Sequence, residues 1–158
     1  LYGGAQEAGR RAGTENVAGI IGMGTASDIS TAHQKEHTRL QQALRDHLMN
    51  RILSEIPMTR LNGSRQERLP GNINVSFAGI DSATLIAMLE AKDIYVSGGS
   101  ACSSSDPSPS HVLKAIGLSD EMALSAVRIT IGHENTPEEI EETFRQIKEC
   151  VHELRSLA

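Results

Sequence analysis

Two short segments in which apolar and polar residues alternate constrain the fold of this chain more than any other feature. Their apolar positions are Ile73, Val75 and Phe77 in residues 71–77, and Val127, Ile129 and Ile131 in residues 127–131. A period of two is typical of half-buried strands. The run Ile94, Tyr95 and Val96 predicts a further short strand.

Helical patterns separate these strands. Leucines recur every fourth residue within 16–53, at Leu40, Leu44 and Leu48, as on one face of a helix. Gly19, Gly22 and Gly24 lie in the first half of that segment. Each weakens a helix by about 1 kcal/mol relative to alanine, or alternatively lets another backbone approach closely. The sequence therefore predicts an α/β fold, a small sandwich with one sheet face covered by helices.

Local end signals refine these helices. Asp81 is placed to cap one helix, and residues 136–139 form a capping box with proline at the first helical position. Pro109 suits the first turn of a short helix that ends at Gly117. The final helix is expected to bury Ile140, Phe144, Ile147, Val151 and Leu154.

Size and charge restrict the function. A chain of 158 residues fits one domain, or one domain plus an arm of another. Its net charge of −5 argues against nucleic-acid or anionic-membrane binding, and no apolar run approaches the roughly 18 residues of a membrane span. The two distant cysteines do not suggest a disulfide framework, so we expect a reducing, cytoplasmic compartment.

Cys102 is the candidate nucleophile. It lies in a glycine- and serine-rich stretch, about residues 97–111, without the apolar periodicity that could bury it. A thiol is already a strong nucleophile at neutral pH, although free cysteines are more often small buried residues. That second interpretation is the better one for Cys150, which we expect at the edge of the packed face of the last helix.

The histidines do not predict a metal site. His33 and His37 have a spacing suitable for zinc, but no third ligand is evident and the surrounding stretch is polar. His111 could serve as a general acid, but a solvated residue in the first turn of a short helix is the better interpretation.

Several segments resemble one known family. Residues 97–113, with Ser97-Gly-Gly-Ser-Ala-Cys102, resemble the long active-site cysteine loop of NifS/IscS-type cysteine desulfurases, pyridoxal-phosphate enzymes of the class V aminotransferase family; a glycine replaces one serine of the pattern. Residues 3–16 resemble the segment after the family's cofactor lysine. Residues 125–132 resemble the strand whose arginine holds the substrate carboxylate, and residues 72–77 fit another strand of the same domain.

The resemblance implies a fold and a set of roles. The fold would be the small C-terminal domain of a fold-type I pyridoxal-phosphate enzyme. Residues 1–16 would be a remnant of the large cofactor-binding domain, and residues 17–158 would form the small domain. In the small domain, a long helical segment would precede a short, mostly antiparallel sheet covered by helices. Cys102 would accept sulfur, Arg128 would bind the substrate carboxylate, and Thr14 would reach the cofactor phosphate of the partner subunit in a homodimer. Without the resemblance, Thr14 could equally begin a helix, and Arg128 would be an exposed residue of an edge strand.

The implied reaction converts L-cysteine to L-alanine and leaves a persulfide on Cys102 for a sulfur-acceptor protein, such as an iron–sulfur scaffold. None of Lys35, Lys92, Lys114 and Lys148 has the surroundings of the family's cofactor lysine. The chain also opens without Met inside a glycine motif, so we expect a fragment that is inactive alone. Two alternatives stay open: a non-enzymatic sulfur carrier that uses Cys102, and another class V enzyme such as a selenocysteine lyase.

Overall fold

The computed structural model describes residues 2–98 and 108–157. The chain divides into two compact units, Leu1–Glu36 and His37–Ala158. A long helix, α1 (Val17–Glu55), contributes its first half to one unit and its second half to the other.

The first unit contains a short 3-10 helix, η1 (Gln6–Gly9), and the first half of α1. Asn16 caps α1, because its Oδ1 accepts a hydrogen bond from the backbone N–H of Gly19 at 3.0 Å. No other group of the described chain comes within 4 Å of where a Cβ would stand at Gly22 or Gly24. The close backbone approach considered for these glycines is therefore absent from the described residues.

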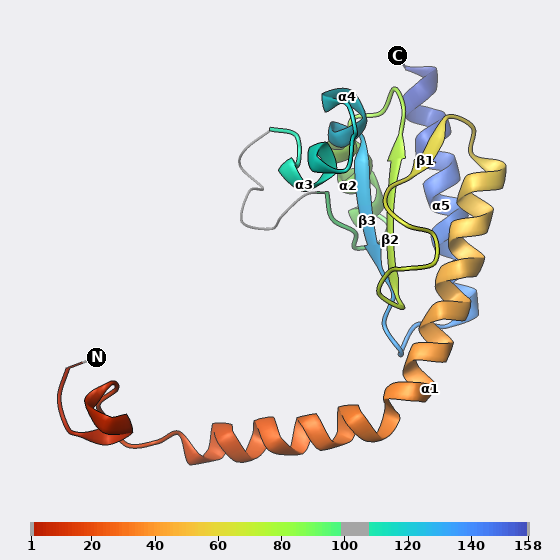
Figure 1. Cartoon of the computed structure of the whole chain (residues 1–158). Coiled ribbons are helices and arrows are strands. Elements are labelled where there is room, and N and C mark those ends of the chain that lie inside the picture. The colour runs from red at the N-terminus through yellow and green to blue at the C-terminus, as the bar shows by residue number, and fades with distance from the viewer. Residues whose placement is uncertain (1, 99–107, 158) are drawn as a thin grey trace. The chain divides into compact units, whose positions relative to one another are not determined.

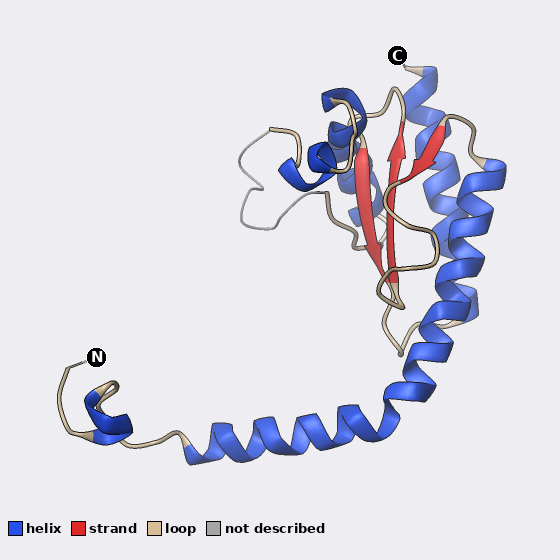
Figure 2. Cartoon of the chain, viewed as in Figure 1, coloured by secondary structure: helices blue, strands red, loops and turns tan. Residues whose placement is uncertain are grey.

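The second unit is built on a three-stranded antiparallel sheet. Its strands β1 (Thr59–Leu61), β2 (Asn72–Phe77) and β3 (Ala126–Thr130) lie in the order β1-β2-β3 (Figures 1 and 2). The register pairs Val75 with Val127 and Ile73 with Ile129, which places the apolar residues of both strands on one face.

Three helices cover this apolar face (Figure 1). They are the second half of α1, α2 (Ser82–Glu90) and α5 (Pro137–Ser156). Leu48 and Ile52 from α1, Leu85 and Leu89 from α2, and Phe144, Ile147 and Val151 from α5 are all buried in one cluster with the strands. The predicted α/β sandwich with helices on one face is confirmed.

The opposite sheet face is polar and partly covered. Two short helices, α3 (His111–Ala115) and α4 (Asp120–Leu124), form a small second cluster with Ala126 at the start of β3. The Ser76 hydroxyl donates to the backbone carbonyl of Met122 at 2.6 Å and so ties β2 to the end of α4.

The predicted helix ends are largely confirmed. Asp81 accepts from the backbone N–H of Thr84 at 2.9 Å, and Thr136 and Glu139 form the complete capping box of α5. Gly117 follows α3 with a φ of +89°. However, α3 begins only at His111, after its cap Ser110, so Pro109 precedes the helix and the prediction that it lies in the first turn was wrong.

Three further predictions differ from the structure. Residues 94–96 form no strand: the backbone N–H of Ile94 donates to the carbonyl of Leu89 at the end of α2, and only Ser97 makes a bridge, to Arg128. Cys150 does not lie at the edge of the packed face, because it is completely buried in the main cluster. Leu154, expected to be buried, is only partly so.

No helix in the described part of the chain is both long enough and apolar enough to cross a lipid bilayer.

Candidate functional site

The polar face of the sheet presents a row of side chains that runs across the strands. Arg128 lies on β3, half-buried, directly opposite Asn74 of β2 in the register. On its other side, Ser97 bridges to Arg128 through two backbone hydrogen bonds, of 3.1 and 2.6 Å. The Arg128 guanidinium also donates from Nη2 to the Ser97 hydroxyl at 2.9 Å.

Asn62 extends the row beyond Asn74. Its backbone N–H donates to the Asn74 carbonyl at 2.9 Å, and its side-chain Nδ2 donates both to Asn74 Oδ1 and to Ser76 Oγ, each at 2.8 Å. Asn62 is only 4% exposed, and its own Oδ1 has no hydrogen-bond partner among the described residues. The row therefore consists of two hydrogen-bonded pairs, Ser97–Arg128 and Asn62–Asn74, which lie next to each other on the face opposite the main hydrophobic core.

Arg128 has the chemistry of a carboxylate-binding residue. A guanidinium is always charged and offers five N–H donors, two of which match the two oxygens of a carboxylate. The structure places Arg128 on the polar face, where its side chain donates a hydrogen bond to a neutral serine rather than to an acid. Within the described residues it forms no salt bridge, and its role in binding a substrate stays a prediction.

Cys102 lies outside the described residues, as do all of residues 99–107. The described chain enters this segment at Gly98, immediately after Ser97. Ser97 is therefore the last residue before the segment that is fixed to the sheet, and it is fixed to Arg128 itself. His111, the candidate general acid, is exposed at the start of α3.

Thr14 lies in the first unit, in the turn before α1. The helix begins after the cap Asn16, so the alternative that Thr14 begins it was wrong. Arg11 holds this turn, since its Nη1 donates to the carbonyls of Gly13 and Thr14 at 2.8 and 3.2 Å. The Thr14 hydroxyl is exposed and makes no hydrogen bond to the rest of the described chain.

The four lysines do not offer a cofactor attachment site. All are exposed, and three are engaged with acidic or amide side chains: Lys92 with Gln146, Lys114 with Asp120, and Lys148 with Glu55. Lysines that form covalent links to carbonyl cofactors are typically buried, where their pKa falls. The role of Thr14 toward a cofactor phosphate stays a prediction.

Two of the histidines contact each other. His37 stacks on His133, with ring centroids 4.0 Å apart. Among residues 2–98 and 108–157, no group of three or more His, Cys, Asp or Glu side chains is arranged to hold a metal ion.

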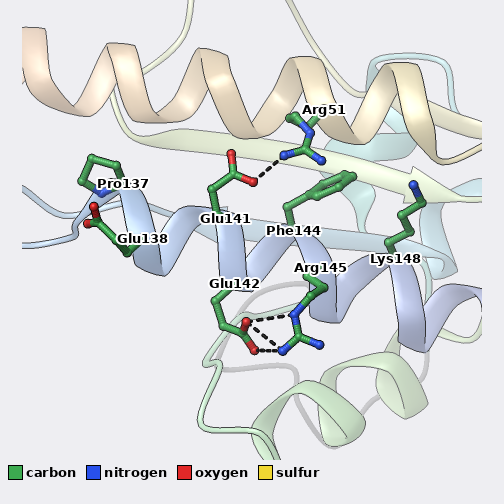
Figure 3. A pocket seen from close by; sticks show the side chains of 8 residues that line it. All are labelled: Arg51, Pro137, Glu138, Glu141, Glu142, Phe144, Arg145 and Lys148. Carbon is green, nitrogen blue, oxygen red and sulfur yellow. Dashed lines mark hydrogen bonds and ion pairs between the residues drawn. The ribbon is translucent and has the colours of Figure 1, made fainter.

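An open groove lies elsewhere, between α1 and α5 (Figure 3). Two pairs of its charged residues are in contact, Arg51 with Glu141 and Arg145 with Glu142. The guanidinium carbon of Arg51 also lies 4.0 Å from the centre of the Phe144 ring. None of the predicted site residues lines this groove. Most of its charges are already paired, so we assign it to helix packing.

Sequence reasoning identified Arg128 but not the residues that surround it. Ser97 and Asn74 belong to segments that resemble the family, but the sequence indicates no role for either residue. No sequence pattern points to Asn62. The alternation within 71–77 and 127–131 could have indicated that Asn74 and Arg128 share a face. No local pattern identifies Ser97 as the neighbour of Arg128, because that pairing joins distant parts of the chain.

Comparisons with known proteins identify relatives over the whole chain. The family described as aminotransferase class-V matches residues 4–143. The cysteine desulfurase IscS of Methanosarcina thermophila is 45% identical over 158 residues, which are 100% of this chain and 39% of that protein. The IscS of Dictyoglomus turgidum is 40% identical, over 100% of this chain and 40% of that protein.

Solved structures agree. The NifS-like protein of Rickettsia africae superposes with a TM-score of 0.82 at 30% identity, over 96% of this chain and 39% of that one. The chain therefore spans about two-fifths of the length of the relatives it matches.

Proposed function

Because this chain belongs to the aminotransferase class-V family, we propose that it is the C-terminal part of a cysteine desulfurase. The complete enzyme, meaning this chain together with the remaining portion that its relatives possess, would convert L-cysteine to L-alanine and pass the sulfur to an acceptor protein. The observation that carries this proposal is the position of Arg128, hydrogen-bonded to the residue at the base of the Cys102 segment.

Arg128 would bind the carboxylate of L-cysteine. Its guanidinium is anchored to the sheet, so little side-chain entropy is lost when a carboxylate binds. An arginine anchored at this position would hold the substrate next to the start of the segment that contains Cys102. Proximity of this kind is a large part of enzymatic rate enhancement.

Cys102 would be the sulfur acceptor. Its thiolate would form a bond with the sulfur of L-cysteine while the carbon–sulfur bond of the substrate breaks. The electron pair of the broken bond stays on carbon, which takes up the proton that the Cys102 thiol has lost. The products are L-alanine and a persulfide on Cys102, so the reaction balances. Pyridoxal phosphate, on which the class V family depends, supplies the electron withdrawal that makes this carbon–sulfur bond breakable.

Thr14 would act on the cofactor from a second subunit. Its exposed hydroxyl could donate a hydrogen bond to the phosphate, and a homodimer would bring it there. The lysine that attaches the cofactor would come from the portion that this chain does not contain. We therefore expect the 158-residue chain alone to release no alanine from L-cysteine. The complete enzyme would be cytoplasmic, and its sulfur acceptor would be a protein such as an iron–sulfur scaffold.

Mass spectrometry of the complete enzyme tests the proposal. After turnover with L-cysteine, we expect one added sulfur atom, about 32 Da, on the peptide containing Cys102. The Cys102→Ser variant should lose the adduct, and the Cys150→Ser variant should keep it. Normal sulfur transfer by Cys102→Ser would overturn the acceptor role.

Two further measurements separate the alternatives. A parallel reaction with selenocysteine tests for a selenocysteine lyase, which would release selenium much faster than sulfur. A sulfur carrier would need no cofactor. If the isolated chain accepted sulfur from a persulfide donor and the complete enzyme did not cleave L-cysteine, the carrier function would replace the one proposed.

A further inference from the structure

We propose that Ser97 is a positioning residue that orients Arg128 for carboxylate binding. This inference rests on the proposed function, because it assigns Arg128 the carboxylate of the substrate. Ser97 accepts a hydrogen bond from Arg128 Nη2 at 2.9 Å. The same two residues exchange both backbone hydrogen bonds, so the serine is fixed to the strand whose side chain it orients.

The chemistry of the pair leaves both groups available to a ligand. Arg128 has five N–H donors, and Ser97 occupies only one of them. In that bond the serine oxygen is the acceptor, so its own O–H proton is still free to donate. A carboxylate placed against Arg128 can therefore receive two N–H donors from the guanidinium and one O–H donor from Ser97.

The neighbours on the other side of Arg128 make the surface rigid. Asn74 lies opposite Arg128 in the register, and its Oδ1 is already engaged by Nδ2 of Asn62. This bond orients the Asn74 amide, whose Nδ2 is then the group left to donate. The row offers hydrogen-bond donors on both sides of Arg128 and no acidic side chain within it, which suits an anion.

Charge also favours this assignment. None of the salt bridges in the described chain involves Arg128, in contrast to Arg51 and Arg145, each of which contacts two glutamates. A half-buried arginine that is held by a neutral hydroxyl keeps its full positive charge for an incoming group. Serine orients the guanidinium and leaves its positive charge uncompensated, whereas aspartate or glutamate at this position would compensate that charge.

The first experiment uses the chain itself and needs no cofactor. Nuclear magnetic resonance of arginine side chains reports how freely each guanidinium rotates. We expect slow rotation at Arg128 in the native chain, faster rotation in Ser97→Ala, and slow rotation again in Ser97→Thr, which keeps the hydroxyl. Hydrogen exchange of the Ser97 and Arg128 backbone amides shows whether the two backbone hydrogen bonds survive the substitution. If they survive and the Arg128 guanidinium rotates equally fast in the native chain and in Ser97→Ala, the proposal is wrong.

The second experiment measures ligand binding to the complete enzyme. L-Alanine, the proposed product, is compared with ethylamine, which lacks only its carboxylate. We expect Ser97→Ala to weaken L-alanine binding about tenfold and to leave ethylamine nearly unchanged, with Ser97→Thr restoring the preference. A purely structural effect would weaken both ligands equally and would contradict the proposal.

Arg128→Ala separates this inference from the proposed function. If that variant still prefers L-alanine over ethylamine as the native enzyme does, the carboxylate role of Arg128 is wrong, and the proposed function loses its main support. If Arg128→Ala loses the preference but Ser97→Ala keeps it, only the role of Ser97 is wrong.

Discussion

At Gly71 the backbone that enters β2 passes so close to the end of β3 that no side chain fits. A Cβ at this position would lie 2.1 Å from the carbonyl oxygen of Ile131, and the Gly71 carbonyl itself accepts from the Ile131 N–H at 2.8 Å. We predict that Gly71→Ala lowers the free energy of unfolding by about 2 kcal/mol, because the strands must separate. Urea denaturation measures this.

Gly132→Ala is the matched control. A Cβ at Gly132 would meet its nearest group, Asn135 Oδ1, at 3.6 Å, an ordinary contact. We expect a change near zero for this variant. Equal losses at both positions would show that the effect reflects glycine in general rather than the contact with Ile131.

The two cysteines should differ in reactivity. Cys150 is fully buried, and this burial raises the pKa of its thiol, so both access and thiolate content are reduced. We predict that a thiol reagent labels Cys102 quickly in the native chain and Cys150 only after unfolding. Peptide mapping identifies the labelled residue. Fast labelling of Cys150 in the Cys102→Ser variant would contradict the burial.

At the scale of single elements, the start of α5 shows how a few residues determine a boundary. The Thr136 hydroxyl accepts from the backbone N–H of Glu139 at 3.2 Å, and Glu139 Oε2 accepts from the Thr136 N–H at 3.0 Å. We predict that Thr136→Ala costs about 1 kcal/mol of stability. Thr136→Ser, which keeps the hydroxyl, should cost much less in the same denaturation experiment; equal costs would mean that the cap does not stabilise α5.

Glu55, the last residue of α1, contacts one cation on its own helix and one on α5. Glu55 accepts from Arg51 at 2.5 Å and from Lys148 at 2.9 Å, and these bonds, the one to Arg51 first, lower the pKa of its carboxyl from 4.5 to about 2. A carboxyl whose pKa is lower in the folded state stabilises the fold above its unfolded pKa. That stabilisation is lost as the pH falls from about 4.5 towards about 2.

We therefore predict that the native chain is more stable than Glu55→Gln at neutral pH, and that the difference in Tm shrinks as the pH falls through this range. Because the Glu55 side chain is partly exposed to solvent, the effect should be small and should decrease with added salt. Thermal melts of both proteins at a series of pH values measure it. A difference that does not depend on pH would show that the carboxylate charge does not contribute.

The elements that were predicted correctly are those with a local physical signal. Alternation identified β2 and β3, and the side chains of Asp81 and Thr136 identified the starts of α2 and α5. β1 is only three residues long, too short for a pattern to appear. Residues 94–96 have strand-like composition, but Ile94 N–H is used by the end of α2, and such competition depends on tertiary position.

The candidate site follows the same rule. The composition around Cys102 and the motif around Arg128 are local, so both residues could be singled out from the sequence. The polar row that joins Arg128 to Ser97 and Asn74 depends on which backbones pair across the sheet. That information is not local, so the sequence alone could not supply it.

At the scale of the whole molecule, the first half of α1 has an unusual surface. Ile20, Ile21, Met23 and Ile29 are each between 58% and 75% exposed, whereas Leu48 and Ile52 in the second half are fully buried. Exposed apolar side chains at this density are typical of a surface that another part of a protein covers. The chain spans about two-fifths of its relatives, and we propose that the remaining portion of the complete enzyme covers these residues.

Hydrogen exchange can test this proposal on α1 alone. In the isolated chain, the first half of the helix contains three glycines and has no buried residue, so its amides should exchange quickly, while the second half is held by the core. We predict that residues 17–36 gain strong protection in the complete enzyme and that residues 44–52 change little. Equal exchange of residues 17–36 in both proteins would mean that this surface stays exposed to water in the complete enzyme as well.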